Sequence, residues 1–197
     1  MNEISSPTVY FKTNGAVNTE RVFQLVQQRA EQTGIRSIVV ATTSGTCGVK
    51  AAELFTGYHV AAVSHSAGFK GADQQELTAE NRQRIELAGG KVLTATHAFG
   101  GVNRAIRRKL NTYQVDEVIA YSLRIFCEGM KVAAEISMMA ADAGLISVNQ
   151  PVIAVAGTGS GADTAVILKP AYAQSFFDLK ILEVICMPAA SHPLFSE

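Results

Sequence analysis

A short apolar run of mostly β-branched residues, Ser37–Ala41, passes directly into a turn rich in hydroxyl side chains and glycine. The run reads SIVVA and the turn that follows reads TTSGTCG. A continuous apolar run of this length is typical of a strand that is covered on both faces, as in a parallel sheet. Parallel neighbours need crossover connections, so the run predicts an α/β fold with helices packed on both sides of the sheet.

The same alternation of strand and helix patterns continues along the chain. Apolar residues at helical spacing follow Asn18, the expected N-cap, and Gly34 is expected to end that helix. Further helices are expected at residues 47–55, 77–88, 104–110, 115–127 and 130–143. Strands are expected at residues 10–11, 37–41, 58–64, 91–95, 151–156, 164–168 and 181–186. We therefore predict one domain over residues 1–197, built as a three-layer α/β/α sandwich.

The order of the strands follows from the connections between them. The loop at residues 157–163 is short, which favours an antiparallel hairpin, so the last strands of a mostly parallel sheet should be antiparallel. The helical segment at residues 102–143 is long enough to carry the chain back across the sheet. The strand at 151–156 should then pair beside the strand at 37–41. The tail after Pro188 is expected to be poorly ordered.

Charge and composition limit the partners of the chain. The 17 lysine and arginine residues balance 17 acidic residues, which argues against a nucleic-acid partner. The basic cluster of Arg104, Arg107, Arg108 and Lys109 is interpreted as a solvated helix face. Three cysteines without paired spacing indicate neither a disulfide framework nor a zinc site. Without a signal-peptide pattern or a membrane-length apolar run, we expect a cytoplasmic protein with no membrane partner. The apolar segment 130–143 is either core or the face of a homo-oligomer.

The turn after the strand at 37–41 is the strongest candidate site. A helix N-terminus presents free backbone N–H groups and partial positive charge, which favour an anion. Gly45 and Gly48 would let the backbone approach a ligand, and the hydroxyl groups nearby would add donors. Ordinary N-capping would need only one hydroxyl. The candidate binding residues in this turn are Thr42, Thr43, Ser44, Gly45, Thr46 and Cys47. The turn matches neither GxxxxGK[ST] nor GxGxxG, which disfavours a nucleoside triphosphatase and a standard dinucleotide fold.

A second glycine-rich loop lies at residues 157–163, and its sequence is GTGSGAD. A plain hairpin would need only one or two glycines, so we interpret the loop as contacting a ligand, against the alternative of a permissive turn. The candidate binding residues are Gly157, Thr158, Gly159, Ser160, Gly161 and Asp163. Because both loops follow the carboxyl ends of neighbouring strands, we expect them to face one shared pocket.

Four further side chains are considered for chemical roles. His65 and His97 follow predicted strand ends and could bind a ligand or transfer protons, or simply pack at the surface. Cys47 lies at a helix N-terminus, which lowers a thiol pKa, but no flanking signature supports a nucleophile. Glu135 lies within an apolar helix, which favours a paired or interfacial role over a catalytic one. No catalytic residue is assigned, and no metal site is expected.

The strand, turn and helix at residues 37–52, followed by VAAVS at 60–64, resemble the C-terminal domain of pyruvate kinase. In that domain a T-x-S-G-x-S turn holds a phosphate of a sugar-bisphosphate effector. Thr42, Ser44 and Gly45 match the pattern, whereas Cys47 replaces its last serine and so lacks one hydroxyl contact. A closer resemblance, to a stand-alone prokaryotic family of this type, is carried by GMKVAAEISMMAADAG at 129–144 and GADTAVILKPA at 161–171.

This resemblance implies the fold of the pyruvate kinase C-terminal domain and a bound flavin mononucleotide, without an established reaction. The leading hypothesis is therefore a flavin mononucleotide-binding protein with the phosphate at residues 42–48, and a flavin-dependent oxidoreductase is the activity that we consider for it. His65, His97 and Phe99 would then line the flavin ring. The alternatives are a non-catalytic sensor of a sugar phosphate or nucleotide, and a hydrolase that uses His65 or His97. A chain of this length leaves no room for the catalytic barrel of pyruvate kinase, so we expect no transfer of phosphate between phosphoenolpyruvate and ADP.

Overall fold

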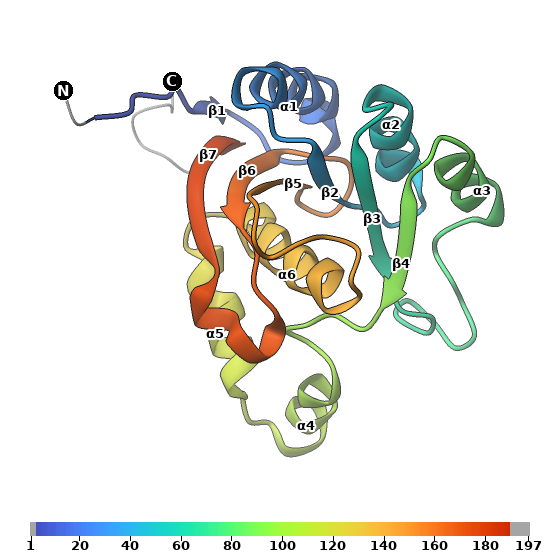
Figure 1. Cartoon of the computed structure of the whole chain (residues 1–197). Helices are drawn as coiled ribbons and strands as arrows, with labels where there is room; N and C mark the ends of the chain where they lie inside the picture. The colour runs from blue at the N-terminus through green and yellow to red at the C-terminus, as the bar shows by residue number, and fades with distance from the viewer. Residues whose placement is uncertain (1–2, 190–197) are drawn as a thin grey trace.

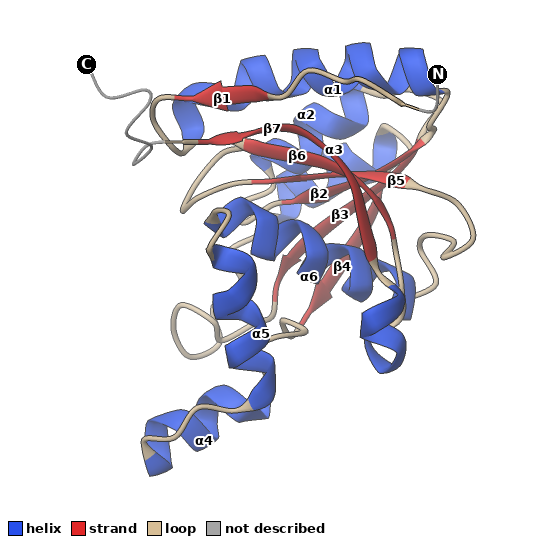
Figure 2. Ribbon diagram, turned by 90° about the vertical axis from the view of Figure 1, so that its left-hand side faces the viewer, coloured by secondary structure: helices blue, strands red, loops and turns tan. Residues whose placement is uncertain are grey.

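The computed structural model describes residues 3–189 and shows a seven-stranded sheet between two layers of helices (Figures 1 and 2). The strands are β1 (Val9–Phe11), β2 (Ser37–Ala41), β3 (His59–His65), β4 (Lys91–Ala95), β5 (Val152–Ala156), β6 (Thr164–Lys169) and β7 (Lys180–Pro188). Their order in the sheet is β1-β7-β6-β5-β2-β3-β4. Only β6 runs antiparallel to its neighbours. The predicted fold class is confirmed, and its antiparallel part is the single strand β6.

The helices divide into two layers. The layer on one face of the sheet contains α1 (Thr19–Thr33), α2 (Thr46–Leu54) and α3 (Ala79–Leu87), and α6 (Glu128–Asp142) covers the other face (Figure 2). α5 (Val115–Arg124) packs on α6, and α4 (Val102–Leu110) extends from the body at the lower end of Figure 1. The structure also contains two short 3-10 helices, η1 (Ala16–Asn18) and η2 (Ala173–Asp178). They were not predicted, because segments this short are too short to show a helical periodicity in the sequence.

The apolar run Ser37–Ala41, which forms β2, is buried on both faces, as predicted. Ile38 and Val40 of β2 pack with α1 and α2 in one apolar cluster, whereas Val39 packs with α6 in another. The expected pairing is also present, because β5 lies parallel to β2 with Val39 opposite Ala154. The strand order therefore reverses between β2 and β5, which is where a crevice opens at the carboxyl ends of an α/β sheet.

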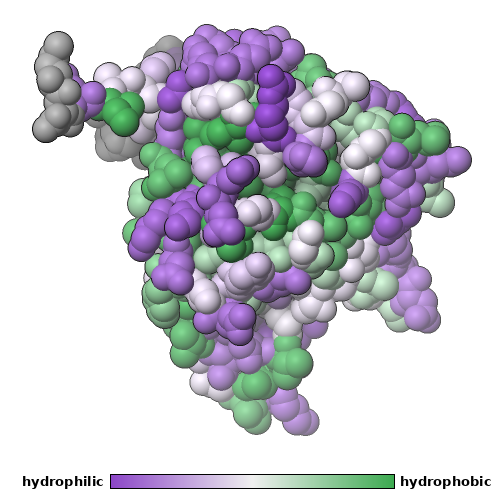
Figure 3. Space-filling model, in the orientation of Figure 1, coloured by the Kyte–Doolittle hydropathy of each residue, from purple (hydrophilic) through white to green (hydrophobic). Residues whose placement is uncertain are grey.

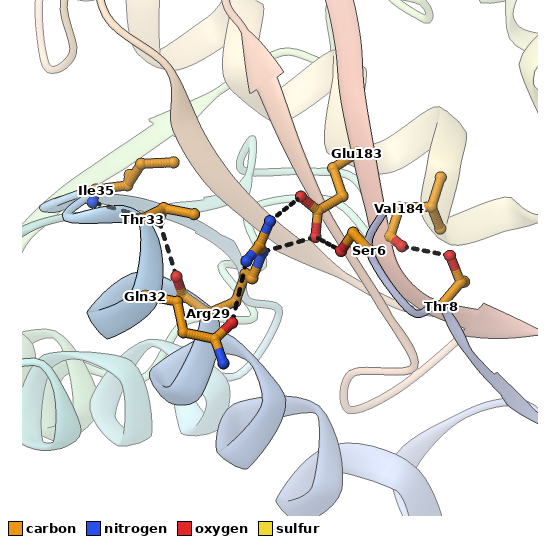
Figure 4. A network of polar contacts seen from close by, with 8 residues as sticks. All are labelled: Ser6, Thr8, Arg29, Gln32, Thr33, Ile35, Glu183 and Val184. Atoms are coloured by element: carbon orange, nitrogen blue, oxygen red, sulfur yellow. Dashed lines mark hydrogen bonds and ion pairs between the residues drawn. The ribbon is translucent and has the colours of Figure 1, made fainter. Parts of the chain in front are cut away.

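α1 is joined to the last strand by a polar cluster (Figure 4). The Arg29 guanidinium donates to both carboxylate oxygens of Glu183, at 2.8 and 2.7 Å, and the Ser6 hydroxyl donates to the same carboxylate at 2.8 Å. Burial acts to raise the pKa of Glu183, but the hydrogen bonds from Arg29 and Ser6 and the charge of Arg29 together outweigh it, so the pKa is lowered. This bidentate pair connects α1 and the N-terminal segment to β7.

Both ends of α1 lie where they were predicted, at Asn18 and Gly34. Asn18 occupies the N-cap position, but its side chain makes no capping hydrogen bond and instead donates to the carbonyl of Thr13 at 2.8 Å. Its amide is used to fix the turn before η1, so it does not accept from the first turn of α1. Gly34 adopts the left-handed conformation, with φ of 72°, and ends α1 as expected.

The expectation for the tail after Pro188 falls almost wholly outside the described residues. Within residues 3–189, no helix has the length and apolar character that crossing a membrane would require.

Candidate functional site

The two glycine-rich loops meet at one cavity of about 630 Å³. Ligand pockets commonly have volumes of roughly 300–1,000 Å³. The cavity lies at the carboxyl ends of β2, β3, β4 and β5, and α6 supplies its apolar floor through Val132, Ile136 and Met139. The predicted residues that line it are Thr42, Thr43, Ser44, Thr46, Cys47, His65, His97, Gly157, Gly159, Ser160 and Gly161. Gly45, Thr158 and Asp163 do not line it.

The first turn of α2 opens into this cavity, and its N-cap residue supplies no capping side chain. Its N-cap residue is Gly45, which has no side chain, whereas Thr78 caps α3 by accepting from the backbone N–H of Asn81 at 3.1 Å. The Thr42 hydroxyl accepts from the N–H of Gly48 at 3.2 Å. The N–H groups of Thr46 and Cys47 belong to the same turn and have no intrahelical carbonyl partner. They are the donors that the helix offers to an anion.

The hydroxyl groups of the turn divide into two roles. Ser44 and Thr46 are exposed, and their hydroxyl oxygens lie 3.1 Å apart, so both can reorient toward a ligand. Thr42 is buried and occupied by its bond to Gly48. The four hydroxyls counted in the sequence therefore include at least one that serves the helix itself.

The expected reason for Gly45 is wrong. We expected it to let a ligand approach the backbone, but a Cβ at this position would lie 2.4 Å from Cβ of Asn81 and 2.7 Å from Cδ1 of Leu77. Gly45 also adopts φ of 105°, a conformation that side chains disfavour. Glycine is required here because the turn packs against the start of α3.

Burial determines the direction in which the pKa of the Cys47 thiol is shifted. A helix N-terminus favours the thiolate, but desolvation dominates and raises the pKa of Cys47, with Lys50 acting in the opposite direction. A thiol held protonated at neutral pH is a poor nucleophile.

The glycine-rich loop between β5 and β6 is organised by Asp163, whose side chain is fully buried. Its carboxylate accepts from the backbone N–H of Gly15 at 2.7 Å and of Thr158 at 3.1 Å, and from the Thr164 hydroxyl at 2.7 Å. We predicted that Asp163 binds the ligand, but its side chain is directed into the protein and does not line the cavity. Gly157, Gly159 and Gly161 present the loop surface to the cavity.

The two histidines lie together in the lining of the cavity, at the ends of β3 and β4. The ring centroids of His65 and His97 are 4.9 Å apart, and Phe69 contacts both rings, at 4.4 and 4.8 Å. Nδ1 of His65 lies 2.7 Å from a carboxylate oxygen of Glu76, a partner that no local motif indicated. Burial lowers the pKa of His97 to about 4, although the Glu135 charge acts to raise it. His97 is therefore neutral near pH 7.

Three cations on the cavity wall were not predicted as site residues. Lys131 of α6 is buried and pairs with Glu135 one turn later, whose other oxygen accepts from the N–H of Phe99 at 3.0 Å. Arg124 pairs with Glu128. Arg104 of α4 also lines the cavity, so the interpretation of its cluster as a solvated face is wrong for this residue. A basic residue on a polar helix carries no sequence signal that separates these two roles.

The chain matches the family model for the pyruvate kinase alpha/beta domain over residues 20–168. This match covers about three quarters of the 197 residues and includes both cavity loops. The chain belongs to this family. It is thus an alpha/beta domain of the pyruvate kinase type, as the resemblance of its first turn indicated.

A solved structure of an O-ureido-L-serine synthase mutant with bound O-ureido-L-serine is also similar, at 20% sequence identity and a TM-score of 0.31. The match covers 71% of this chain, and the chain spans about half the length of that protein.

One aromatic ring that we expected to line the cavity, that of Phe99, lies elsewhere. Phe99 is buried against Phe176, with ring centroids 5.7 Å apart, and does not line the cavity. Phe69, in the loop after β3, takes the place beside the histidines that we expected for Phe99. Among residues 3–189, no group of three or more His, Cys, Asp and Glu side chains has an arrangement that could hold a metal ion.

Proposed function

We propose that the cavity binds a phosphorylated ligand, with its phosphate at the turn 42–48 and flavin mononucleotide as the first candidate. The observation that carries the proposal is the first turn of α2, whose N-cap residue Gly45 has no side chain and which opens into a cavity of ligand size. The N–H groups of Thr46 and Cys47 and the hydroxyls of Ser44 and Thr46 are donors suited to a phosphate. Family membership supports the proposal, because the matched residues 20–168 include this turn.

The rest of the cavity fits a flat ring. His65, Phe69 and His97 form an aromatic wall, and Val132, Ile136 and Met139 form an apolar floor. A ring between these surfaces would be shielded from water, while the neutral His97 would offer a hydrogen bond without adding charge. A bound flavin would supply electron transfer, and the residues of this chain would bind and orient it.

A second candidate function rests on the His65–Glu76 pair. A carboxylate that orients an imidazole is the arrangement of a general base, so the pair favours hydrolysis of a phosphate ester over binding alone. Turnover of 4-nitrophenyl phosphate that is lost on His65→Gln would support this function, and no turnover would contradict it.

The binding proposal is tested by calorimetric titration of the purified protein with flavin mononucleotide, riboflavin and ribose 5-phosphate. Tight binding of flavin mononucleotide and weak binding of riboflavin would show that the phosphate is required. Equal binding of flavin mononucleotide and ribose 5-phosphate would favour the sensor of sugar phosphates. Failure of all phosphorylated probes to bind would contradict the proposal.

A further inference from the structure

α5 is apolar on two opposite faces. On its inner face, Ala120 and Leu123 pack against α6. On its outer face, Val115, Val118 and the C-cap residue Ile125 are 76%, 55% and 81% exposed. A helix that covers a core with one face normally presents polar residues on the other. The outer face of α5 is therefore an apolar surface that residues 3–189 leave open.

The outer face has the residue spacing of a pairing helix. Val115, Val118, Ser122 and Ile125 are separated by three, four and three positions, as are the contact residues of paired helices. We call these four residues the α5 seam. None of them is charged, and the Ser122 hydroxyl already donates to the carbonyl of Val118, at 3.0 Å. The α5 seam can therefore be covered without leaving a charge or a hydroxyl unpaired.

Aromatic side chains enlarge the α5 seam. Tyr113, Tyr121 and Phe126 are each more than half exposed, and the ring centroids of Tyr113 and Tyr121 are 5.7 Å apart. Together with the seam they expose on the order of 700 Å², close to the ~800 Å² that each partner buries in a standard interface. The largest apolar patch of a typical monomer covers roughly 300–600 Å². α5 lies at the lower left of Figure 1, and Figure 3 shows hydrophobic residues among hydrophilic ones along that margin.

A second copy of the chain is the partner that this surface fits. A two-fold axis places an interface against itself, so a charge beside the axis would meet its own like charge, and the uncharged α5 seam avoids this conflict. The formal net charge of the chain is zero, from 17 basic and 17 acidic residues, so two copies do not repel each other at long range. An anionic membrane is a poorer match, because two of the three charged residues of α5, Asp116 and Glu117, are acidic.

The apolar segment 130–143, considered in the sequence as core or oligomer face, forms most of α6 and is buried almost throughout within the chain itself. We propose instead that two copies form a homodimer through the α5 seam, with the two α5 helices antiparallel across a two-fold axis. Val115 then lies against Ile125 of the second copy, and Val118 lies against Ser122 of the second copy. The dimer does not depend on the proposed function, because the α5 seam lies outside the cavity lining.

The test is sedimentation equilibrium of the full chain at about 1–100 µM, without added ligand. The wild-type protein should reach twice its monomer mass of 21.0 kDa, with a dissociation constant of about 10 µM or lower. Val118→Glu should raise this constant at least about 100-fold, because it buries an unpaired charge at the centre of the α5 seam. Leu87→Glu is the matched control and should leave the dimer intact. Leu87 is an apolar residue of α3, 80% exposed, in the other layer of helices.

A second pair of variants tests the antiparallel arrangement without relying on one substitution. Ser122→Lys alone should also give monomers, because its ammonium would face the apolar Val118 of the second copy. An equimolar mixture of Val118→Glu and Ser122→Lys chains should dimerise again, because the new charges are opposite in sign and adjacent in the antiparallel pair. Far-UV circular dichroism should show the wild-type helix content for every variant, since each substituted position is exposed in the single chain.

The proposal fails on any of several results. A wild-type protein that stays monomeric at about 100 µM would overturn it, whatever else binds to the α5 seam. Val118→Glu or Ser122→Lys chains that remain dimeric would overturn it as well. A dimer that also dissociates in Leu87→Glu, or a mixture of the two charged variants that stays monomeric, would show that α5 is not the antiparallel interface.

Discussion

The two loops that meet at the cavity have similar compositions but different structural roles. The turn at 42–48 is rich in hydroxyls and glycine, as is the loop at 157–163. The first leaves the initial N–H groups of α2 open to the cavity, whereas the second is closed around the buried carboxylate of Asp163. Composition alone therefore does not distinguish a loop whose hydrogen-bond donors are free for a ligand from a loop whose donors are already bonded within the protein.

Removal of Asp163 should give the largest effect. Asp163→Ala deletes the acceptor of three hydrogen bonds at a fully buried position, so the donors of Gly15, Thr158 and Thr164 lose their partner. A buried donor without a partner costs about 1–3 kcal/mol, and the half-buried Gly15 and Thr158 lie at the low end of that range because water can reach them, so the free energy of unfolding should fall by about 3–5 kcal/mol. Urea denaturation measures this loss.

Ser160→Ala is the matched control in the same loop, because Ser160 is exposed and lines the cavity. It should change the free energy of unfolding by less than about 0.5 kcal/mol. A comparable loss in both variants would break the contrast between the two loops.

The next largest effect comes from a comparison of two glycines, Gly45 and Gly159, which separates the cost of a steric clash from the cost of a left-handed backbone conformation. Gly45→Ala should lower the free energy of unfolding by about 2–4 kcal/mol, because it places a side chain on a left-handed backbone and also creates a clash with Asn81 and Leu77. Gly159 also has a positive φ, of 74°, but nothing lies within 4 Å of an added Cβ. For Gly159→Ala only the conformational cost of about 1–2 kcal/mol therefore remains. Thermal and urea unfolding of the pair would show whether Gly45 is the more sensitive position; equal losses would contradict the packing role.

The sequence predicted the fold well because its signals are local. The apolar run of β2, the glycine that ends α1 and the short hairpin loop each act within a few residues, and each is confirmed. The pairing of β5 beside β2 could be predicted because the long helical segment between β4 and β5 carries the chain back across the sheet. Helix bounds differ by about two residues, as at α6, which begins at Glu128.

The sequence predicted the location of the candidate site better than the roles of its residues. The strand-end rule placed both loops and both histidines at one cavity. The partners of Asp163 and His65 lie up to 148 positions away and depend on tertiary packing, which single-sequence patterns do not report. Arg104 was assigned to solvent because its helix is polar, and only the contact with Phe69 reveals its position at the cavity.

A smaller effect tests the open loop directly. Thr46→Val keeps the shape of the side chain and removes a hydroxyl that is exposed at the cavity. If this hydroxyl donates to a phosphate, the dissociation constant for flavin mononucleotide should rise about 5- to 30-fold, equivalent to about 1–2 kcal/mol, with an unchanged melting temperature. Calorimetric titration measures the affinity. Ser160→Ala serves again as the control, and an equal loss of affinity in that variant would erase the distinction between the loops.

The smallest effect concerns His97, which lines the same cavity as both loops. Burial lowers its pKa from 6.5 to about 4, so the unfolded chain takes up a proton at His97 before the folded protein does. The stability contributed by neutral His97 is complete above pH 6.5 and is lost as the pH falls toward 4. Because His97 is only partly buried, we expect the loss to be about 1 kcal/mol, well below the full linkage value.

His97→Gln removes the titrating group, so urea denaturation between pH 7.5 and 4.5 should show a shallower decline of the unfolding free energy for the variant than for the wild type. Parallel declines would mean that His97 titrates alike in both states and that its wall of the cavity is open to water. Steeper loss in the variant would contradict the burial of the imidazole altogether.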